Sequence, residues 1–382
     1  MITPDCSQLF SFEEGTIYLD QGGFGAAPRA VRSVAEAMRA HVEAAPRPFF
    51  DGEQRLRWRE IAGVVAARFS ASPDDVALIE NATDGVNAVL RSLAFQGGDE
   101  ILITSMTYGA VANAARHIAK SHGATTVEAR LPFPCADPQS CLDAVRAAIT
   151  PRTRLAILDH VTSPTALALP IAEMVALCRA HRVRVLVDGA HAPGALPLDV
   201  PAVGADWYVG NLHKWYFAPR SCGFLWARPD SARALAPAIL SWDVARPFPH
   251  SFEWTGTRDP SAWLAIPAAF AFMDRFGEAC VRSHNHALVL EGVDILAKAW
   301  GARLETPAVM TGAMALAPLP AALAAPATEE GRALVQRRLW EERRIACSCV
   351  LFEGRIHVRI SAQIYNAPEH YRELAQAVLN GL

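Results

Sequence analysis

The chain has 382 residues, of which 51% are hydrophobic and 20% charged; this excludes a disordered protein and allows two packed domains. The net charge of −3, with no basic cluster, argues against a nucleic-acid partner and a polyanionic substrate. The sequence shows no signal peptide and no apolar run of the roughly 20 residues that a membrane span needs.

The eight cysteines are scattered and form no Cys-x-x-Cys pair. Cys347 and Cys349 are too close together for usual zinc-ligand spacing. We therefore expect free thiols, a cytoplasmic location and no metal site.

Short apolar runs alternate with amphipathic segments from about residue 75 to 227. This alternation predicts a mostly parallel sheet covered by helices on both faces, with ligands bound beyond the carboxyl ends of the strands. The predicted strands are 75–79, 100–104, 125–129, 154–159, 183–188, 207–209 and 223–226, and the predicted helices are 84–95, 109–122, 138–149 and 170–181.

The C-terminal part follows a different pattern, which predicts a separate small α+β domain. Residues 260–300 indicate one or two long helices, and the Ala/Pro-rich stretch 308–327 is either a strand with a loop or a link. The remaining predicted elements are a helix at 328–343, strands at 345–350 and 355–360, and a helix at 367–380.

The segment Asn-Ala-Thr-Asp-Gly-Val-Asn (81–87) follows a predicted strand and opens a helix. Thr83 is placed to cap that helix, whose free N–H groups could bind an anion. An ordinary capped helix explains the pattern as well. Ser163, in a loop after the 154–159 strand, is similarly either a turn residue or a ligand contact.

Asp188 ends the run Val-Leu-Val-Asp-Gly-Ala-His, and Lys214 follows in Gly-Asn-Leu-His-Lys-Trp. The chain has only three lysines, and Lys120 and Lys298 lie in amphipathic helical patterns that expose them to solvent. An acid at a strand end with His191 and a lysine among apolar neighbours suits pyridoxal phosphate: the lysine forms a Schiff base and the acid holds the ring nitrogen protonated. No phosphate-binding glycine motif follows a strand, so ATP and dinucleotides are disfavoured.

Together these motifs resemble the class V aminotransferase family of pyridoxal phosphate enzymes of fold type I, in its isopenicillin N epimerase-like branch. The likeness runs in family order through nearly the whole chain. It is carried by segments 18–25, 81–87, 159–165, 187–194, 210–215, 254–263 and 359–366.

The resemblance implies a large cofactor-binding domain at 21–260, preceded by an arm at 1–20 that joins the small domain, and a helical connection with the small domain at 261–382. It also implies roles for individual residues. Lys214, Asp188 and His191 would be catalytic. The cofactor-binding residues would be Ala82, Thr83, Asp84, Tyr108, Ser163, Asp188, His191, Asn211, His213 and Lys214, with Thr257 reaching the phosphate of the neighbouring subunit in a homodimer.

On the substrate side the resemblance implies Arg359, Gly23, Phe24 and Arg258, with Arg359 on the α-carboxylate of an amino acid. From its strand pattern alone, Arg359 is instead expected at the surface. Asp20-Gln21 stands where the branch usually has Asn-Asn, which puts a penicillin-type substrate in doubt.

The implied reaction begins with removal of the Cα proton by Lys214. Epimerisation or racemisation is the first expectation. The alternatives are a C–S lyase acting on a cysteine conjugate and a class V aminotransferase. A cysteine desulfurase is a weaker reading, because Cys347 and Cys349 lie in a predicted strand rather than a loop. A non-catalytic, pyridoxal phosphate-binding regulator is the rival outside enzymes.

Overall fold

The computed structural model describes residues 6–320 and 326–381. Its centre is a seven-stranded sheet with the strand order β2-β8-β7-β6-β5-β3-β4. Its strands are β2 (Val76–Ile79), β3 (Glu100–Thr104), β4 (Thr125–Ala129), β5 (Thr153–Asp159), β6 (Arg184–Gly189), β7 (Trp207–Asn211) and β8 (Gly223–Ala227).

Most neighbouring strands of this sheet are parallel, which confirms the predicted mixed, mostly parallel architecture. The pairs β3–β4, β3–β5, β5–β6 and β6–β7 are parallel. Strand β8 is antiparallel to both β7 and β2. The chain therefore turns back directly after β7, and the loop between β7 and β8 carries Lys214 at one edge of the sheet.

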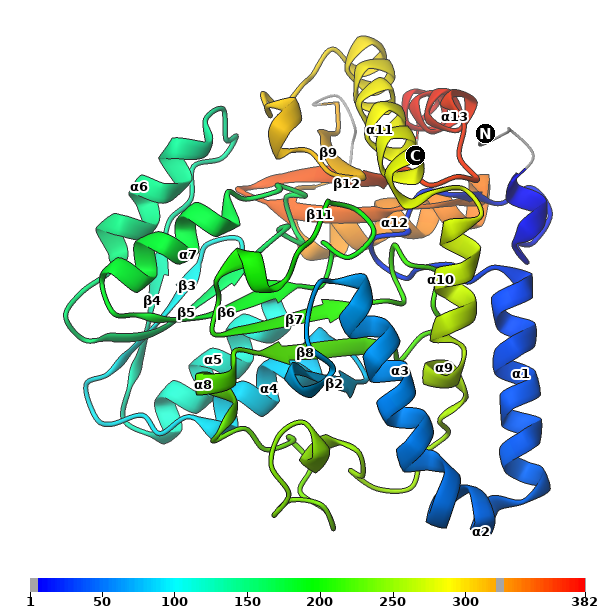
Figure 1. Cartoon of the computed structure of the whole chain (residues 1–382). Helices are drawn as coiled ribbons and strands as arrows, with labels where there is room; N and C mark the ends of the chain where they lie inside the picture. Colours follow the sequence, from blue (N-terminus) through cyan, green and yellow to red (C-terminus); the bar gives the residue numbers. More distant parts are fainter. Residues whose placement is uncertain (1–5, 321–325, 382) are drawn as a thin grey trace.

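Helices cover both faces of the sheet (Figure 1). Side chains alternate in direction along each strand, so a strand that is apolar throughout presents apolar side chains on both faces, and both must be covered. Helices α4 (Ala82–Ser92) and α5 (Gly109–Ser121) pack on one face. The core on the other face includes residues of α1 (Arg29–Ala44), α3 (Gln54–Arg68), α6 (Pro138–Ala148), α7 (Ile171–Ala180) and α10 (Ile266–Asp274).

The segment predicted as one or two long helices is divided into α9 (Ser261–Leu264), α10 and α11 (Glu278–Trp300). Gly277 has a φ of 77°, a conformation that ends α10 and that only glycine adopts readily. Ala265 separates α9 from α10, and Pro267 lies in the first turn of α10. The prediction of long helices is therefore correct only for α11.

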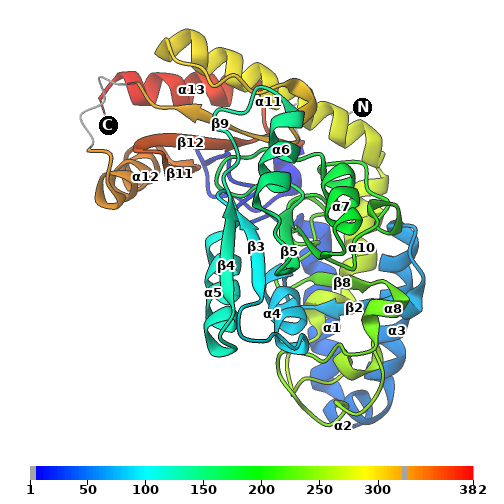
Figure 2. The same ribbon diagram turned by 90° about the vertical axis from the view of Figure 1, so that its left-hand side faces the viewer.

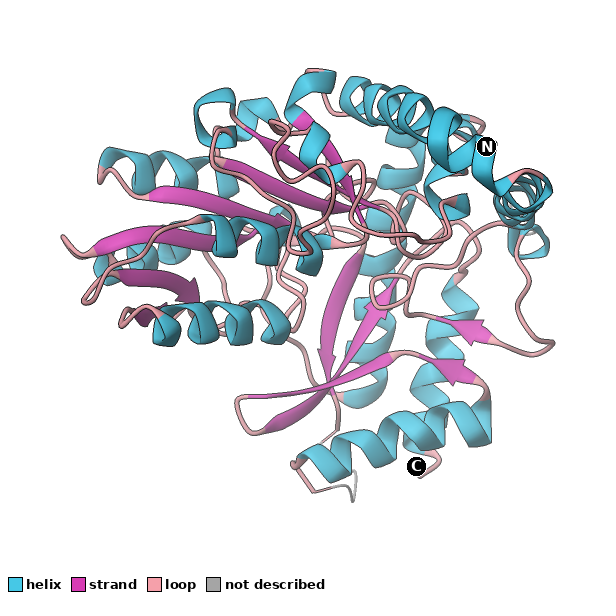
Figure 3. Cartoon of the chain, turned by 90° about the horizontal axis from the view of Figure 1, so that it is seen from below, coloured by secondary structure: helices cyan, strands magenta, loops and turns pink. Residues whose placement is uncertain are grey.

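The C-terminal elements lie at one end of the molecule (Figure 2) and have a core of their own. Strands β11 (Ser348–Phe352), β12 (Arg355–Ser361) and β9 (Met314–Pro318) form an antiparallel sheet in that order, apart from the large sheet (Figure 3). Helices α12 (Glu329–Arg343) and α13 (Pro368–Leu379) accompany it. Residues 321–325 of the predicted strand or link lie outside the described residues.

The N-terminal segment reaches this C-terminal region. Strand β1 (Ile17–Tyr18) pairs in parallel with β10 (Ile345–Ala346), and Leu19 donates a further backbone hydrogen bond to Ala346. The turn that follows β1 is therefore fixed between the two sheets. Residues 1–5 of the predicted N-terminal arm lie outside the described residues. Among the helices of the described ranges, none has the length and apolar composition for crossing a membrane.

Candidate active site

A cavity of about 660 Å³ lies where β5, β6 and β7 end and the β7–β8 loop begins. Polar loops at the carboxyl ends of parallel strands are the usual ligand site in such sheets. The structure brings most of the predicted site residues together here. Those that line the cavity are Gly23, Phe24, Ala82, Thr83, Tyr108, Ser163, Asp188, His191, Asn211, His213, Lys214 and Arg359.

Lys214 lines the cavity beside His191, and the part of the lining made by these two residues with the buried Asp159 and Asp188 is called the inner end below. Its Nζ is 3.0 Å from the Nε2 of His191. Burial and, after it, the nearby Arg359 guanidinium lower the pKa of Lys214 to about 7, although the charges of Asp188 and Asp20 oppose the shift. A neutral amine, able to act as a nucleophile or base, is therefore present near neutral pH.

The two histidines beside Lys214 are neutral. Burial holds the pKa of His191 well below its usual value, and burial lowers that of His213 to about 4. The Nδ1 of His213 is bonded to the Cys222 carbonyl, so that this nitrogen carries the proton and Nε2 remains an acceptor. The Nδ1 of His191 is buried and has no partner among the described residues.

Two carboxyl groups lie side by side at the inner end of the cavity. Asp159 ends β5 and pairs in register with Asp188 of β6. Asp188 Oδ1 accepts the N–H of Ala190, whereas Asp159 Oδ2 has no partner among the described residues. Burial raises the pKa of both groups, and that of Asp159 is raised well above its usual value, also because of the Asp188 charge.

The predicted cap of α4 is wrong: Asn81, not Thr83, is the N-cap, and its side chain accepts the N–H of Asp84. Asn81 has extended dihedral angles directly after β2, so the helix begins earlier than expected. The N–H of Ala82 is bonded to Asn211 Oδ1. The N–H groups of Ala82 and Asp84 are thus already bonded within the protein. Thr83, which also lines the cavity, is the residue at this helix terminus that is placed to bind an anion.

Arg359 is buried, so the surface position expected from its strand pattern alone is wrong. Its Nη1 donates to the carbonyl of Ser163 at 2.6 Å and to its hydroxyl at 3.1 Å. Its Nη2 donates to Ser348 Oγ at 3.1 Å and to Asp20 Oδ1 at 3.4 Å. The guanidinium is thus already paired with protein groups, and only its Nε, buried, lacks a partner among the described residues.

The turn after β1 packs against the backbone of Lys214. Gln21 Nε2 donates to the Lys214 carbonyl at 2.6 Å, and Gln21 Oε1 accepts from Ala26 N–H and Tyr365 Oη. A side chain at Gly25 would overlap the His213 carbonyl, which explains the glycine there. Gln21 is therefore a buried residue that links the turn to the Lys214 backbone by hydrogen bonds. Gly22, Gly23 and Phe24 line the cavity.

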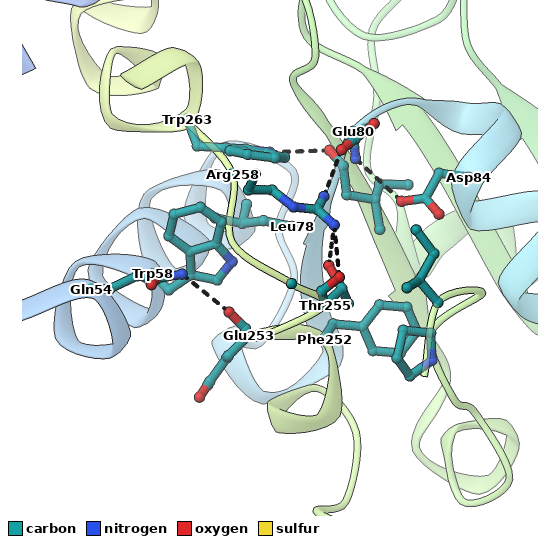
Figure 4. A pocket seen from close by; sticks show the side chains of 14 residues that line it. Gln54, Trp58, Leu78, Glu80, Asp84, Phe252, Glu253, Thr255, Arg258 and Trp263 are labelled. Carbon is teal, nitrogen blue, oxygen red and sulfur yellow. Dashed lines mark hydrogen bonds and ion pairs between the residues drawn. The ribbon is translucent and has the colours of Figure 1, made fainter. Parts of the chain in front are cut away.

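Three predicted site residues do not line this cavity. Asp84 and Arg258 belong to a smaller pocket of about 80 Å³, where Arg258 forms an ion pair with Glu80 at 2.6 Å (Figure 4). The side chain of Asp84 accepts the N–H of Glu80. Thr257 is exposed on the surface. Their expected roles in binding stay predictions.

The structure adds cavity-lining residues that were not assigned from the sequence: Gly22, Asn81, Asp159, Val161, Ala190, Arg220, Ser221 and Ser348. Asp159 could have been assigned from the sequence, since it ends a predicted strand as Asp188 does. Ser348 could not, because its position in the site depends on the pairing of β11 with β12, which places it opposite Arg359. Cys347 and Cys349 are both buried, and neither lines the cavity.

The cavity fits pyridoxal phosphate. A neutral amine can condense with the cofactor's aldehyde, and a buried acid can hold a protonated ring nitrogen. A helix N-terminus with Thr83 lies in the same lining and suits a phosphate. The unpartnered His191 Nδ1 is a buried polar atom that a bound ligand could satisfy.

Known proteins resemble this chain over nearly its full length. A putative L-cysteine desulfhydrase of Oryza sativa is 33% identical, covering 96% of this chain and 83% of the relative. The isopenicillin N epimerase of Streptomyces clavuligerus is 33% identical, covering 95% of this chain and 94% of the relative.

Solved structures share the fold. The cystine C–S lyase C-DES, in complex with its product cysteine persulfide, matches with a TM-score of 0.81 at 23% identity over 96% of this chain and 98% of the other. A mutant of C-DES, with glycine covalently linked to its pyridoxal phosphate, matches with a TM-score of 0.83 at 24% identity and full coverage of both chains.

The sequence pattern of the family described as "Aminotransferase class-V" matches residues 17–317, which is most of the chain. This match and the relatives at 33% identity confirm the resemblance, the fold and the expected cofactor. The chain therefore belongs to the class V aminotransferase family and is a pyridoxal phosphate-dependent enzyme.

Proposed function

We propose that the enzyme is a C–S lyase, which removes the Cα proton of cysteine or a cysteine conjugate and expels the sulfur from Cβ. The observation that carries the proposal is a single amine base in the lining. Lys214 is the one lysine among the described cavity residues, and its pKa is lowered to about 7. Elimination needs one base at Cα, whereas two-base epimerisation needs a second proton-transfer group on the opposite side.

The neighbouring side chains support a single base. His191 lies against Lys214 at 3.0 Å and is neutral, so it can hold the amine in place but is a weak proton acceptor. His213 is likewise neutral, with a pKa of about 4. Towards the mouth, the lining includes the partly exposed rings of Phe24 and Tyr108. This arrangement favours removal of a proton from one side of Cα.

In this proposal Arg359 gives up some of its hydrogen bonds to the protein and binds the carboxylate of the substrate, which orients the substrate. Lys214 takes up the Cα proton and returns it to the departing sulfur. When bound, pyridoxal phosphate supplies an electron sink for the charge at Cα, and Asp188 keeps its ring nitrogen protonated. The net reaction for cysteine consumes one water and yields pyruvate, ammonia and hydrogen sulfide.

The relatives support both the lyase and the epimerase. A putative L-cysteine desulfhydrase of Oryza sativa and a probable one of Arabidopsis thaliana are 33% and 32% identical to this chain, and two isopenicillin N epimerases are 33% and 31% identical. Asp20 favours the lyase: it places a carboxylate next to Arg359, whereas the epimerase branch usually has asparagine there. We therefore rank epimerisation, the first expectation from the sequence, second.

A nuclear magnetic resonance time course in D₂O tests the reaction. Purified enzyme loaded with pyridoxal phosphate is incubated with L-cysteine, cystine and S-alkylcysteines, each alongside the Lys214→Ala variant. We expect pyruvate and a released thiol, both absent with the variant. Deuterium at Cα with an intact carbon skeleton would instead establish an epimerase, and formation of the corresponding keto acid with the sulfur retained would establish an aminotransferase.

We also propose a homodimer in which Thr257 contacts the cofactor phosphate of the partner. Support comes from the exposed position of Thr257 and from the exposed apolar side chains of Ile239, Leu240 and Trp242, the last of which is 88% exposed. Subunit mixing tests this arrangement. Hybrids of Lys214→Ala and Thr257→Val subunits should regain activity, because one site then has both Lys214 and Thr257.

The cytoplasmic location stays a prediction.

A further inference from the structure

Asp159 is a buried carboxyl group to which the mechanism above assigns no task. It lies at the carboxyl end of β5, and only 2% of its surface is exposed. Its Oδ2 is buried without a partner among the described residues, although the residue lines the cavity. A buried polar atom without a partner is uncommon in a folded protein and requires an explanation.

The neighbour of Asp159 across the sheet is Asp188. The two residues pair in register on adjacent parallel strands, which places their Cα atoms about 5 Å apart with both side chains on the same face. Both residues line the same cavity and are almost fully buried. Two carboxylates this close cannot both be ionised in a buried site without a large cost, so the pair holds one proton.

The contacts of the two groups indicate which one keeps that proton. Asp188 has a backbone donor, the N–H of Ala190, on Oδ1. Lys214 lies near enough to favour its charged form. Thr107 and the backbone of Tyr108 also offer Asp159 hydrogen bonds, but burial outweighs them and holds the pKa of Asp159 well above its usual value, and its Oδ2 has no partner among the described residues. The negative charge is therefore better stabilised on Asp188 and the proton on Asp159.

We propose that Asp159 is a positioning residue: it stays protonated, donates a hydrogen bond to the Asp188 carboxylate, and so fixes a single negative charge opposite the cofactor's ring nitrogen. Asp159 then acts on the cofactor through Asp188. Its hydrogen bond orients the Asp188 carboxylate and withdraws electron density from it. This inference concerns the cofactor site and does not depend on which reaction the enzyme catalyses.

Two matched substitutions separate a neutral from a charged Asp159. Asp159→Asn keeps a neutral donor of the same shape, whereas Asp188→Asn removes the charge that faces the ring nitrogen. We expect Asp159→Asn to bind pyridoxal phosphate within about threefold of the wild type. Asp188→Asn should bind it at least about tenfold more weakly, because a hydrogen bond to a charged group is lost. Absorbance titration of apoenzyme with pyridoxal phosphate measures both.

Asp159→Ala removes the donor and should weaken cofactor binding by about threefold to tenfold, the net effect of one hydrogen bond. Thermal unfolding of each apoenzyme shows whether the variant is folded. Infrared difference spectra of wild type minus Asp159→Asn read protonation directly, with no need for turnover. We expect the carbonyl stretch of a protonated carboxyl group in the wild type.

Three outcomes would overturn the inference. Asp159→Asn could lose as much cofactor affinity as Asp188→Asn, which would show that Asp159 acts as a carboxylate. The difference spectrum could show a carboxylate band instead of a protonated carboxyl band. Asp159→Ala could also match the wild type in affinity and absorbance, and Asp159 would then have no role at the cofactor. None of these outcomes depends on whether the lyase assignment is correct.

Discussion

At the inner end of the cavity a buried ring nitrogen has no protein partner among the described residues, whereas at the Arg359 end both terminal guanidinium nitrogens already have partners. That ring nitrogen is Nδ1 of His191, whereas the inferred hydrogen bond to Asp188 accounts for the buried Oδ2 of Asp159. Both terminal guanidinium nitrogens of Arg359 donate to Ser163, Ser348 or Asp20. The inner end is thus prepared to receive a group that stays bound, while the Arg359 end must exchange contacts each time a substrate enters or leaves.

The largest expected effect comes from removing the base of the inner end. Lys214→Ala should lower kcat by about 10³-fold or more, because both general-base catalysis and covalent attachment of the cofactor are lost. Steady-state rates and the visible absorbance of the bound cofactor measure this change. Lys120→Ala, on the exposed side of α5, is the matched control and should leave both unchanged. Normal turnover by the Lys214 variant would refute the assignment of the base.

At the other end, Arg359→Gln should lower kcat/KM by about 100-fold through a higher KM, because the charged hydrogen bonds to the substrate carboxylate are lost. The change also leaves the buried Asp20 without its cation, which should destabilise the fold. A double variant, Asp20→Asn with Arg359→Gln, separates the two effects. It should regain thermal stability but not substrate affinity, and a full recovery of KM would show that Arg359 has only a structural role.

Gly25→Ala tests how firmly the inner end is held. Its new methyl group would overlap the His213 carbonyl, so the turn after β1 or the Lys214 backbone must shift, at a cost of about 1–3 kcal/mol in unfolding free energy. Gly52→Ala has no atom within 4 Å of the added methyl and serves as the control. Chemical denaturation measures both variants. Equal stabilities would mean that the turn moves freely.

The smallest effect is expected from Asp20→Asn, which removes the ion pair with Arg359 but leaves the hydrogen bonds of Arg359 to Ser163 and Ser348 in place. The freed guanidinium should bind the substrate carboxylate about threefold to tenfold more tightly, seen as a lower KM. The Asp20 charge also raises the pKa of Lys214. Because substrate binding frees the amine from the cofactor, wild-type kcat should rise with pH through about 7 as the amine loses its proton, and in the variant this rise should move to lower pH. An unchanged profile would remove Asp20 from the active-site electrostatics.

The sequence allowed prediction where a signal is local. Asp188 ends an apolar run, Lys214 lies among apolar neighbours, and the alternation of strands and helices identified the large sheet. Helix α1 was not assigned, although its buried Val31, Ala35 and Val42 recur at helical spacing. That helix was therefore predictable in principle.

Other features depend on contacts between distant parts of the chain. The Asp20–Arg359 pair requires the pairing of β1 with β10 and of β11 with β12, which no local pattern specifies. The buried position of Arg359 followed from the family resemblance, because an arginine within a strand is usually at the surface. Asn81 and Thr83 are only two residues apart, so sequence spacing alone did not decide which of them caps α4.

The pairing of β1 with β10 has a consequence for the order of events during synthesis. Residues 17–18 leave the ribosome long before their partners at 345–346. The wall formed by Gly22, Gly23 and Phe24 follows β1 closely, so it cannot reach its final place until the chain has been made through residue 346. Capture of the cofactor in a closed site is therefore a late step, and a chain that stops before residue 345 would keep its lysine but lack the enclosure around it.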